Sequence, residues 1–96
     1  MAILSFQDSL TKIFYSDGEI KKGMGWANCA KTALRKLDCL NYAQTLQDLR
    51  SPPSNHLEAL KGDLTGFYSL RINRQWRIIF KWSMKGASEV SIIDYH

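Results

Sequence analysis

The sequence predicts a single α+β domain in which N-terminal helices pack on a small antiparallel sheet. Between residues 26 and 42, apolar residues recur at intervals of three and four, the period of an α-helix with one buried face. From residue 66 onward the interval becomes two, the period of a strand. A chain of 96 residues is long enough for one domain, spanning residues 1–96, with one modest core.

A short strand and a short helix are the first elements that the sequence predicts. The apolar run at residues 2–6 is typical of a strand. Ser5 or Asp8 is placed to cap a helix that continues through residue 14. The turn-forming residues 16–18 end that helix.

The clearest predicted helix covers residues 26–42, and its buried stripe contains the following residues: Trp26, Ala30, Ala33, Leu34, Leu37 and Leu40. Lys31, Arg35 and Lys36 lie off the stripe, either as a solvated face or as an electrostatic rail for RNA. Cys29 and Cys39 fall about 15 Å apart along this helix. Because that distance is too long for a disulfide, they are expected to be free thiols, and their spacing does not suit zinc.

Short elements follow this helix. Residues 45–49 predict one helical turn with Leu46 and Leu49 facing inward. The Ser-Pro-Pro-Ser run at residues 51–54 predicts a corner, because proline lacks a backbone donor and restricts the residue before it. An extended edge segment is expected at residues 56–60.

A β-hairpin is predicted from residue 66 to residue 82. A two-residue loop would mix its apolar and polar faces, whereas a three-residue loop at residues 73–75 separates them. The resulting pairs are Ile72 with Trp76, Leu70 with Ile78, and Tyr68 with Phe80. The hairpin therefore has one apolar face and one basic face.

The same register places Arg71 directly opposite Arg77. Like charges at opposite positions destabilise a sheet by about 0.2–1 kcal/mol. The pair is either a tolerated feature of a solvated face or a site where an anion sits between two guanidinium groups. Arg74 in the loop and Lys81 further along the second strand are additional candidates for binding phosphate.

A third strand is predicted at the C-terminal end of the chain. The alternation pairs Trp82 with Val90 and Phe80 with Ile92, after a loop at residues 83–87. It then carries Tyr95 to a position opposite Arg77. Asp94 and His96 would point to the other face unless a bulge reorients them.

The overall composition is that of an ordinary globular protein with a moderate positive charge. The net charge is +4, and residues 1–53 and 54–96 contribute equally to it, so the sequence has no basic tail. No apolar run approaches the roughly 20 residues that span a bilayer, and the N-terminus lacks the features of a signal peptide. A cytoplasmic location without membrane association is therefore expected.

Three sequence blocks resemble the HigB branch of the RelE/ParE toxin superfamily, and the resemblance extends over essentially the whole chain. The blocks are LKGD at residues 60–63, SLRINRQWRI at residues 69–78 and DYH at residues 94–96. The resemblance implies a RelE/ParE-like fold and a toxin of a type II toxin–antitoxin pair. Toxins of this branch are ribonucleases that cut mRNA in the ribosomal A site without a metal or another cofactor.

The resemblance also implies partners and alternatives. The expected partners are the ribosome, mRNA and a HigA-like helix-turn-helix antitoxin that neutralises the toxin in a hetero-oligomeric complex. A ParE-like member would instead poison a topoisomerase and cleave no RNA. A non-catalytic RNA-binding domain and a protein-binding scaffold are further alternatives, because a fold alone does not determine function.

Carried over residue by residue, the resemblance makes Lys61 and Arg77 the expected phosphate contacts, with Arg71 as a third cation. Tyr95 and His96 match the active-site end of the family, with Asp94 as a supporting or catalytic member. His96 is the first candidate for proton transfer because the reference pKa of histidine is near 6.5.

The acid–base assignment around residue 58 has three alternatives. Several relatives have histidine where this chain has Glu58, and a histidine occurs here two positions earlier, at residue 56. On a strand, His56 and Glu58 would share a face. Glu58 is therefore a general base, or His56 substitutes for it, or Glu58 only pairs with an arginine.

Overall fold

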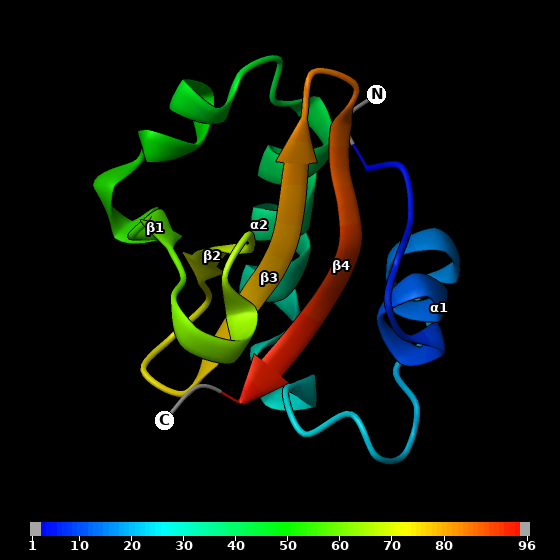
Figure 1. Ribbon diagram of the computed structural model, residues 1–96. Coiled ribbons are helices and arrows are strands. Elements are labelled where there is room, and N and C mark those ends of the chain that lie inside the picture. The colour runs from blue at the N-terminus through cyan, green and yellow to red at the C-terminus, as the bar shows by residue number, and fades with distance from the viewer. Residues whose placement is uncertain (1–2, 95–96) are drawn as a thin grey trace.

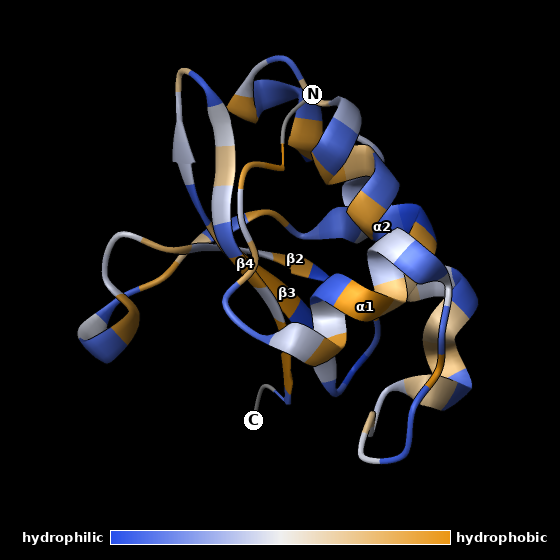
Figure 2. Cartoon of the chain, turned by 90° about the vertical axis from the view of Figure 1, so that its right-hand side faces the viewer, coloured by the Kyte–Doolittle hydropathy of each residue, from blue (hydrophilic) through white to orange (hydrophobic). Residues whose placement is uncertain are grey.

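The computed structural model describes residues 3–94, and its two α-helices and four-stranded antiparallel sheet confirm the predicted α+β fold (Figure 1). The elements are α1 (Ser9–Asp17), α2 (Ala30–Tyr42), β1 (Glu58–Ala59), β2 (Tyr68–Arg71), β3 (Trp76–Ser83) and β4 (Gly86–Asp94). The strand order is β1-β2-β3-β4. Helix α2 crosses one face of the sheet, and α1 lies beside β4 (Figure 2). In the described part of the chain, no helix has the length and apolar content needed to cross a membrane.

Helix α1 is capped by Asp8 and not by Ser5. The Asp8 carboxylate accepts a hydrogen bond from the Thr11 backbone N–H (3.0 Å), and the helix ends at Gly18, whose φ is 74°. The Ser5 hydroxyl instead accepts a hydrogen bond from the Glu89 backbone N–H (3.0 Å). The two candidate caps therefore serve different elements.

The strand predicted at residues 2–6 is replaced by two isolated parallel bridges to β4. Ile3 pairs with Ala87, and Phe6 pairs with Val90. Between these bridges, Glu89 has a left-handed φ of 52°, so the backbone of β4 is not extended there. This interruption prevents a continuous ladder.

The long predicted helix begins with a 3₁₀ turn, Ala27–Cys29, before α2 proper starts at Ala30. Its predicted stripe is largely confirmed, but Leu34 is 42% exposed and Lys36 is buried. At about 100° per residue, Lys36 lies on the same side as Leu40, while Leu34 lies on the other side of Leu37. The buried face is therefore rotated toward Lys36, and the prediction that Lys36 lies off it is wrong.

The corner between α2 and the sheet holds Lys36 in place. The predicted turn is the 3₁₀ segment Leu46–Arg50, with Leu49 buried, and a second 3₁₀ turn, Pro53–Asn55, follows the prolines. The buried Asn55 amide donates to the backbone carbonyl of Leu49 (3.1 Å), and its oxygen accepts from Lys36 Nζ (2.6 Å). One asparagine therefore joins the corner to α2.

The predicted hairpin register is confirmed, with Tyr68 opposite Phe80 and Leu70 opposite Ile78. The Asn73 side-chain oxygen accepts hydrogen bonds from the backbone N–H groups of Gln75 and Trp76, both at 2.8 Å. This arrangement stabilises the three-residue loop and fixes the register.

The predicted register between the last two strands is wrong. Ile78 lies opposite Ile92, and Trp82 lies opposite Ala87. The turn after Ser83 is shorter than predicted because β4 already begins at Gly86, and the register shifts between Ile79 and Lys81. As a consequence, Arg77 lies opposite Ile93 and not opposite Tyr95.

The apolar face of the sheet packs against the helices to form the core. The buried residues of this core include Phe14, Trp26, Ala33, Leu37, Leu40, Leu70, Ile78, Phe80, Val90 and Ile92. The segment that contains the 3₁₀ turn Gly62–Leu64 lies on the other side of the sheet, where Leu64 and Ile79 line one cavity (Figure 1). Arg77 is also on this side, away from α2, because strand residues alternate between faces.

Candidate functional site

Arg77 is the centre of a group of contacts that joins three strands. Its Nη1 donates to the Ser69 hydroxyl on β2 (2.6 Å) and to the His56 backbone carbonyl (3.4 Å). Its Nη2 forms an ion pair with the Glu58 carboxylate on β1 (2.8 Å). The Arg77 side chain is 11% exposed, whereas that of Glu58 is 51% exposed. The Ser69 hydroxyl and the His56 carbonyl thus hold the guanidinium in place, and the solvent-accessible carboxylate of Glu58 pairs with it.

The predicted pairing of Arg71 with Arg77 is confirmed in the backbone, but the two side chains bind different acceptors. Arg71 Nε donates to the backbone carbonyl of Asn73 (3.1 Å), while Arg77 binds Glu58. This divergence reduces the repulsion expected between like charges on adjacent strands.

Glu58 and His56 do not share a strand face as the sequence suggests. Strand β1 begins at Glu58, and His56 ends the preceding 3₁₀ turn with a left-handed φ of 45°. His56 contributes its backbone carbonyl to Arg77 and has an exposed side chain. Glu58 pairs with an arginine, Arg77, and its part in proton transfer stays a prediction.

The remaining predicted cations lie in different settings. Lys61 is exposed immediately before the 3₁₀ turn Gly62–Leu64, and Arg74 is exposed in the β2–β3 loop. Lys81 pairs with Glu89 (3.1 Å) and lies 5.2 Å from the centre of the Phe67 ring. Lys81 is therefore engaged with Glu89 and Phe67 and does not belong to the Arg77 group.

Asp94 lies opposite Trp76, one position beyond the Arg77–Ile93 pair, and so points to the other face of the sheet. Its carboxylate accepts a hydrogen bond from the Gln75 side-chain amide (2.9 Å). The predicted site residues Tyr95 and His96 lie outside the described residues. Within residues 3–94, no group of three or more His, Cys, Asp or Glu side chains is placed to hold a metal ion.

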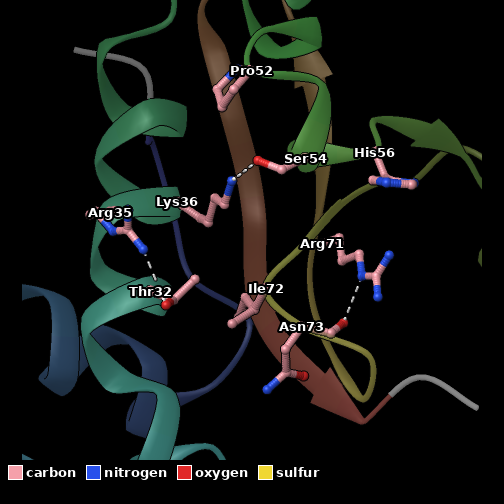
Figure 3. A pocket seen from close by; sticks show the side chains of 9 residues that line it. All are labelled: Thr32, Arg35, Lys36, Pro52, Ser54, His56, Arg71, Ile72 and Asn73. Atoms are coloured by element: carbon pink, nitrogen blue, oxygen red, sulfur yellow. Dashed lines mark hydrogen bonds between the residues drawn. The ribbon is translucent and has the colours of Figure 1, made fainter.

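A second group of cations surrounds a cavity of about 380 Å³ between α2 and the β2–β3 loop (Figure 3). Its lining residues are Thr32, Arg35, Lys36, Pro52, Ser54, His56, Arg71, Ile72 and Asn73. The sequence offers one signal for it, the basic edge of the helix, of which Arg35 and Lys36 line the cavity and Lys31 does not. The sequence does not show that Asn55 draws Lys36 inward, or that His56 and Arg71 meet the same cavity.

Burial changes the acid–base behaviour of two side chains near the helices. It lowers the pKa of Lys36, and the neighbouring positive charge of Arg35 adds to this effect. Burial also raises the pKa of Tyr15, assisted by its hydrogen bond to the Asp38 carboxylate (2.7 Å). The charge on Lys36 is therefore held against an unfavourable environment.

Two solved bacterial structures share the fold of this chain. The YoeB–YefM complex from Staphylococcus aureus matches with a TM-score of 0.61 and 21% identity, covering 100% of this chain and 97% of that chain. YafQ from Escherichia coli matches with a TM-score of 0.55 and 17% identity, covering 96% and 90%. At these identities the similarity defines the fold.

Sequence comparison defines the family. Residues 4–96 match the HigB-like toxin family, described as the RelE-like toxin of type II toxin–antitoxin system HigB. Toxin HigB-1 of Vibrio cholerae is 37% identical over 93 residues, covering 97% of this chain and 96% of that protein. An uncharacterized protein of Haemophilus influenzae is 39% identical over 77 residues, covering 80% and 75%. The chain belongs to the HigB-like toxins, as its three sequence blocks predict.

Proposed function

We propose that this toxin is an endoribonuclease that cuts mRNA held in the ribosomal A site. The observation that carries the proposal is the Arg77 group, in which a nearly buried guanidinium is fixed by Ser69 and carries an exposed carboxylate from Glu58. A fixed cation stabilises developing negative charge without having to reorganise during the reaction. Its ion pair shows that this guanidinium binds an oxyanion in the free protein.

The proposed reaction uses the RNA's own 2′-OH as the nucleophile. The 2′ oxygen forms a bond to the adjacent phosphorus, the bond to the 5′ oxygen breaks, and the products are a 2′,3′-cyclic phosphate and a 5′-hydroxyl. A base takes the proton of the 2′-OH, and an acid supplies one to the leaving 5′ oxygen. This reaction needs alignment, proton transfer and charge stabilisation but no metal.

In this scheme the scissile phosphate takes the place of the Glu58 carboxylate on Arg77. Planar guanidinium groups match the oxygens of phosphate and of carboxylate in the same bidentate manner, so the two anions compete for one site. The displaced Glu58 is then available as a general base, with His56 and His96 as the other candidates. Lys61 is the second phosphate contact, Asp94 a supporting residue, and Tyr95 orients the nucleophile or stacks on a base.

The proposed partners follow from the family. Among the structures that share the fold is a complex of YoeB with YefM. For this chain we propose a HigA-like helix-turn-helix antitoxin that binds the toxin in a hetero-oligomer. The site of action is then the cytoplasm, where ribosomes translate mRNA.

Mapping mRNA ends in cells that express the toxin tests this function. The wild-type toxin is expected to create new 5′-hydroxyl ends within translated codons. Arg77→Ala is expected to reduce them by about 100- to 1,000-fold, as for loss of one charge-stabilising donor. Lys85→Ala is the matched control, because Lys85 is an exposed cation in the β3–β4 turn.

Two further measurements sharpen the interpretation. A thermal melt of Arg77→Lys separates loss of activity from loss of folding, since lysine keeps the charge but not the bidentate geometry. Arrested replication with intact mRNA would contradict the nuclease and indicate a ParE-like topoisomerase poison.

A further inference from the structure

We infer that the cavity between α2 and the β2–β3 loop is a second RNA-phosphate site, with Arg35 and Arg71 as its phosphate-binding side chains. We call it the Arg35 cavity, and its nine lining residues are those given above. The inference rests on the proposed function in that it takes RNA to be the ligand. It adds a phosphate contact where α2 meets the β2–β3 loop, with Arg35 on the helix and Arg71 on the strand that pairs with β3.

The lining of the Arg35 cavity is basic. Four of its nine residues are Arg35, Lys36, Arg71 and His56, and none is acidic. Figure 3 shows Arg35 near one end, His56 and Arg71 near the other, and Lys36 reaching across to Ser54. Its volume of about 380 Å³ lies within the usual range for ligand sites, and Pro52 and Ile72 offer apolar surface for a ribose.

The positive charge of the cavity is not balanced by carboxylates within residues 3–94. The ion pairs found there join Lys21 to Glu19, Arg77 to Glu58, and Lys81 to Glu89. Lys36, only 8% exposed, is held by neutral partners, the Ser54 hydroxyl (3.2 Å) and the Asn55 amide oxygen (2.6 Å). Buried charges are normally paired with an opposite charge, which a bound anion would supply here.

The Arg35 guanidinium is positioned by its own helix. Its Nη2 donates to the Thr32 hydroxyl one turn earlier (3.3 Å), and both residues line the cavity. Arg71 is oriented by the Asn73 carbonyl at the other end. The two guanidinium groups are thus presented by rigid elements, which reduces the entropy lost when an anion binds.

Continuity with the Arg77 group favours RNA as the occupant. Arg71 is the cross-strand neighbour of Arg77, and the carbonyl of His56 accepts from Arg77 Nη1. Both Arg71 and His56 also line the Arg35 cavity. One RNA backbone can therefore place a phosphate at Arg77 and another in the cavity.

Binding of a non-cleavable RNA tests the inference. Affinity of a single-stranded 2′-O-methyl oligonucleotide is measured by fluorescence anisotropy over a series of salt concentrations. Arg35→Gln is expected to weaken binding and to lower the slope of log affinity against log salt by about 0.7, the value for one phosphate contact on a single strand. Arg71→Gln is expected to have a similar effect.

The control is Lys31→Gln, the same change of charge on the same helix. Lys31 is exposed and lines a different, largely apolar cavity with Leu34. It is expected to leave the salt slope unchanged. Equal slopes for the Arg35 and Lys31 variants would overturn the inference, because net charge alone would then explain the binding.

Two comparisons identify the partner. Cosedimentation with ribosomes free of mRNA shows whether ribosomal RNA also supplies the phosphate, and either RNA source supports the inference. If Arg35→Gln weakens antitoxin binding but leaves the RNA slope unchanged, the cavity binds a carboxylate of the antitoxin and the inference is wrong.

The test is independent of cleavage. If the toxin cuts no mRNA but Arg35→Gln lowers the salt slope, the second phosphate site is supported and the proposed nuclease activity is wrong. If mRNA cleavage depends on Arg77 but Arg35→Gln leaves the salt slope unchanged, the nuclease activity is supported and the second phosphate site is wrong.

Discussion

At the scale of single residues, Arg77 shows how an oxyanion site is prepared in a small domain. A serine hydroxyl and a backbone carbonyl hold the guanidinium in one place, and a carboxylate satisfies its charge while no substrate is bound. Leaving such a cation unpaired would require desolvation without compensation. Glu58 therefore stabilises the site, and it also competes with the anion that the site is proposed to bind.

The competition leads to a test at Glu58. Glu58→Gln is expected to tighten binding of a non-cleavable RNA, because the neutral amide competes less well with phosphate for Arg77. The dissociation constant can be measured by anisotropy at low salt. The control is Glu89→Gln, which removes a carboxylate paired with Lys81 on the same sheet. Weaker binding by Glu58→Gln would show that Glu58 supports the RNA complex directly.

The sequence predicts this residue geometry only in part. The pairing of Arg71 with Arg77 follows from a three-residue loop and a two-residue period, both local features. The sequence does not predict that Glu58 pairs with Arg77, because this contact depends on where the short strand β1 begins. The Arg35 cavity is still harder to predict from the sequence, because the buried Asn55 determines which way Lys36 points.

At the scale of elements, polar side chains on the helices form hydrogen bonds that join α1 to α2 and α1 to β4. The Tyr15 hydroxyl on α1 donates to the Asp38 carboxylate on α2 (2.7 Å), and the Thr11 hydroxyl accepts from the Ile92 backbone N–H (3.4 Å). Periodicity predicts where helices form but not these contacts between elements. The register of β4 is missed for a related reason, since the left-handed Glu89 has no strong local sequence signal.

The contact between α1 and α2 is testable through its pH dependence. Tyr15→Phe is expected to lower the free energy of unfolding by about 1.5–3 kcal/mol at neutral pH, through loss of one hydrogen bond to a charged group. The pKa of Tyr15 is raised above its ordinary value of 10.0 in the folded state. The contribution of the Tyr15 hydroxyl to stability is therefore complete below about pH 10 and is lost as the pH rises above it.

Urea denaturation of both proteins between pH 7 and pH 11 measures this difference. The difference in unfolding free energy between the wild type and Tyr15→Phe is expected to stay constant up to about pH 10 and to narrow above it. If this difference already disappears near neutral pH, another titrating group controls the contact.

At the scale of the whole molecule, residues 3–7 close the sheet along the edge of β4. Hydrogen bonds join the Leu4 N–H to the Ala87 carbonyl (2.7 Å), the Val90 N–H to the Ser5 carbonyl (3.1 Å), and the Gln7 N–H to the Val90 carbonyl (2.8 Å). An uncovered strand edge is a template for pairing with another chain. We therefore expect this segment to stabilise the fold and to keep the edge of β4 from pairing with another chain.

Removal of residues 1–6 tests this role. The shortened chain is expected to lose about 2–3 kcal/mol of stability, because Ile3 is buried on β4, and to self-associate through the opened edge. Chemical denaturation and analytical ultracentrifugation measure the two effects. Leu4→Gln is the control, since the Leu4 side chain is 51% exposed and its backbone hydrogen bond is retained. A monomeric shortened chain with an unchanged midpoint would exclude this role.

The pairing of residues 3–7 with β4 also has a consequence for the timing of folding. The hydrogen-bonded residues Ser5 and Glu89 are separated by 84 positions in the chain. At roughly 5–20 residues per second, the early segment waits roughly 4–17 s for its partner to be synthesised. During that interval β3, the strand that carries Arg77, also lacks its β4 neighbour. Translation of the chain itself thus sets the earliest moment at which the sheet is complete.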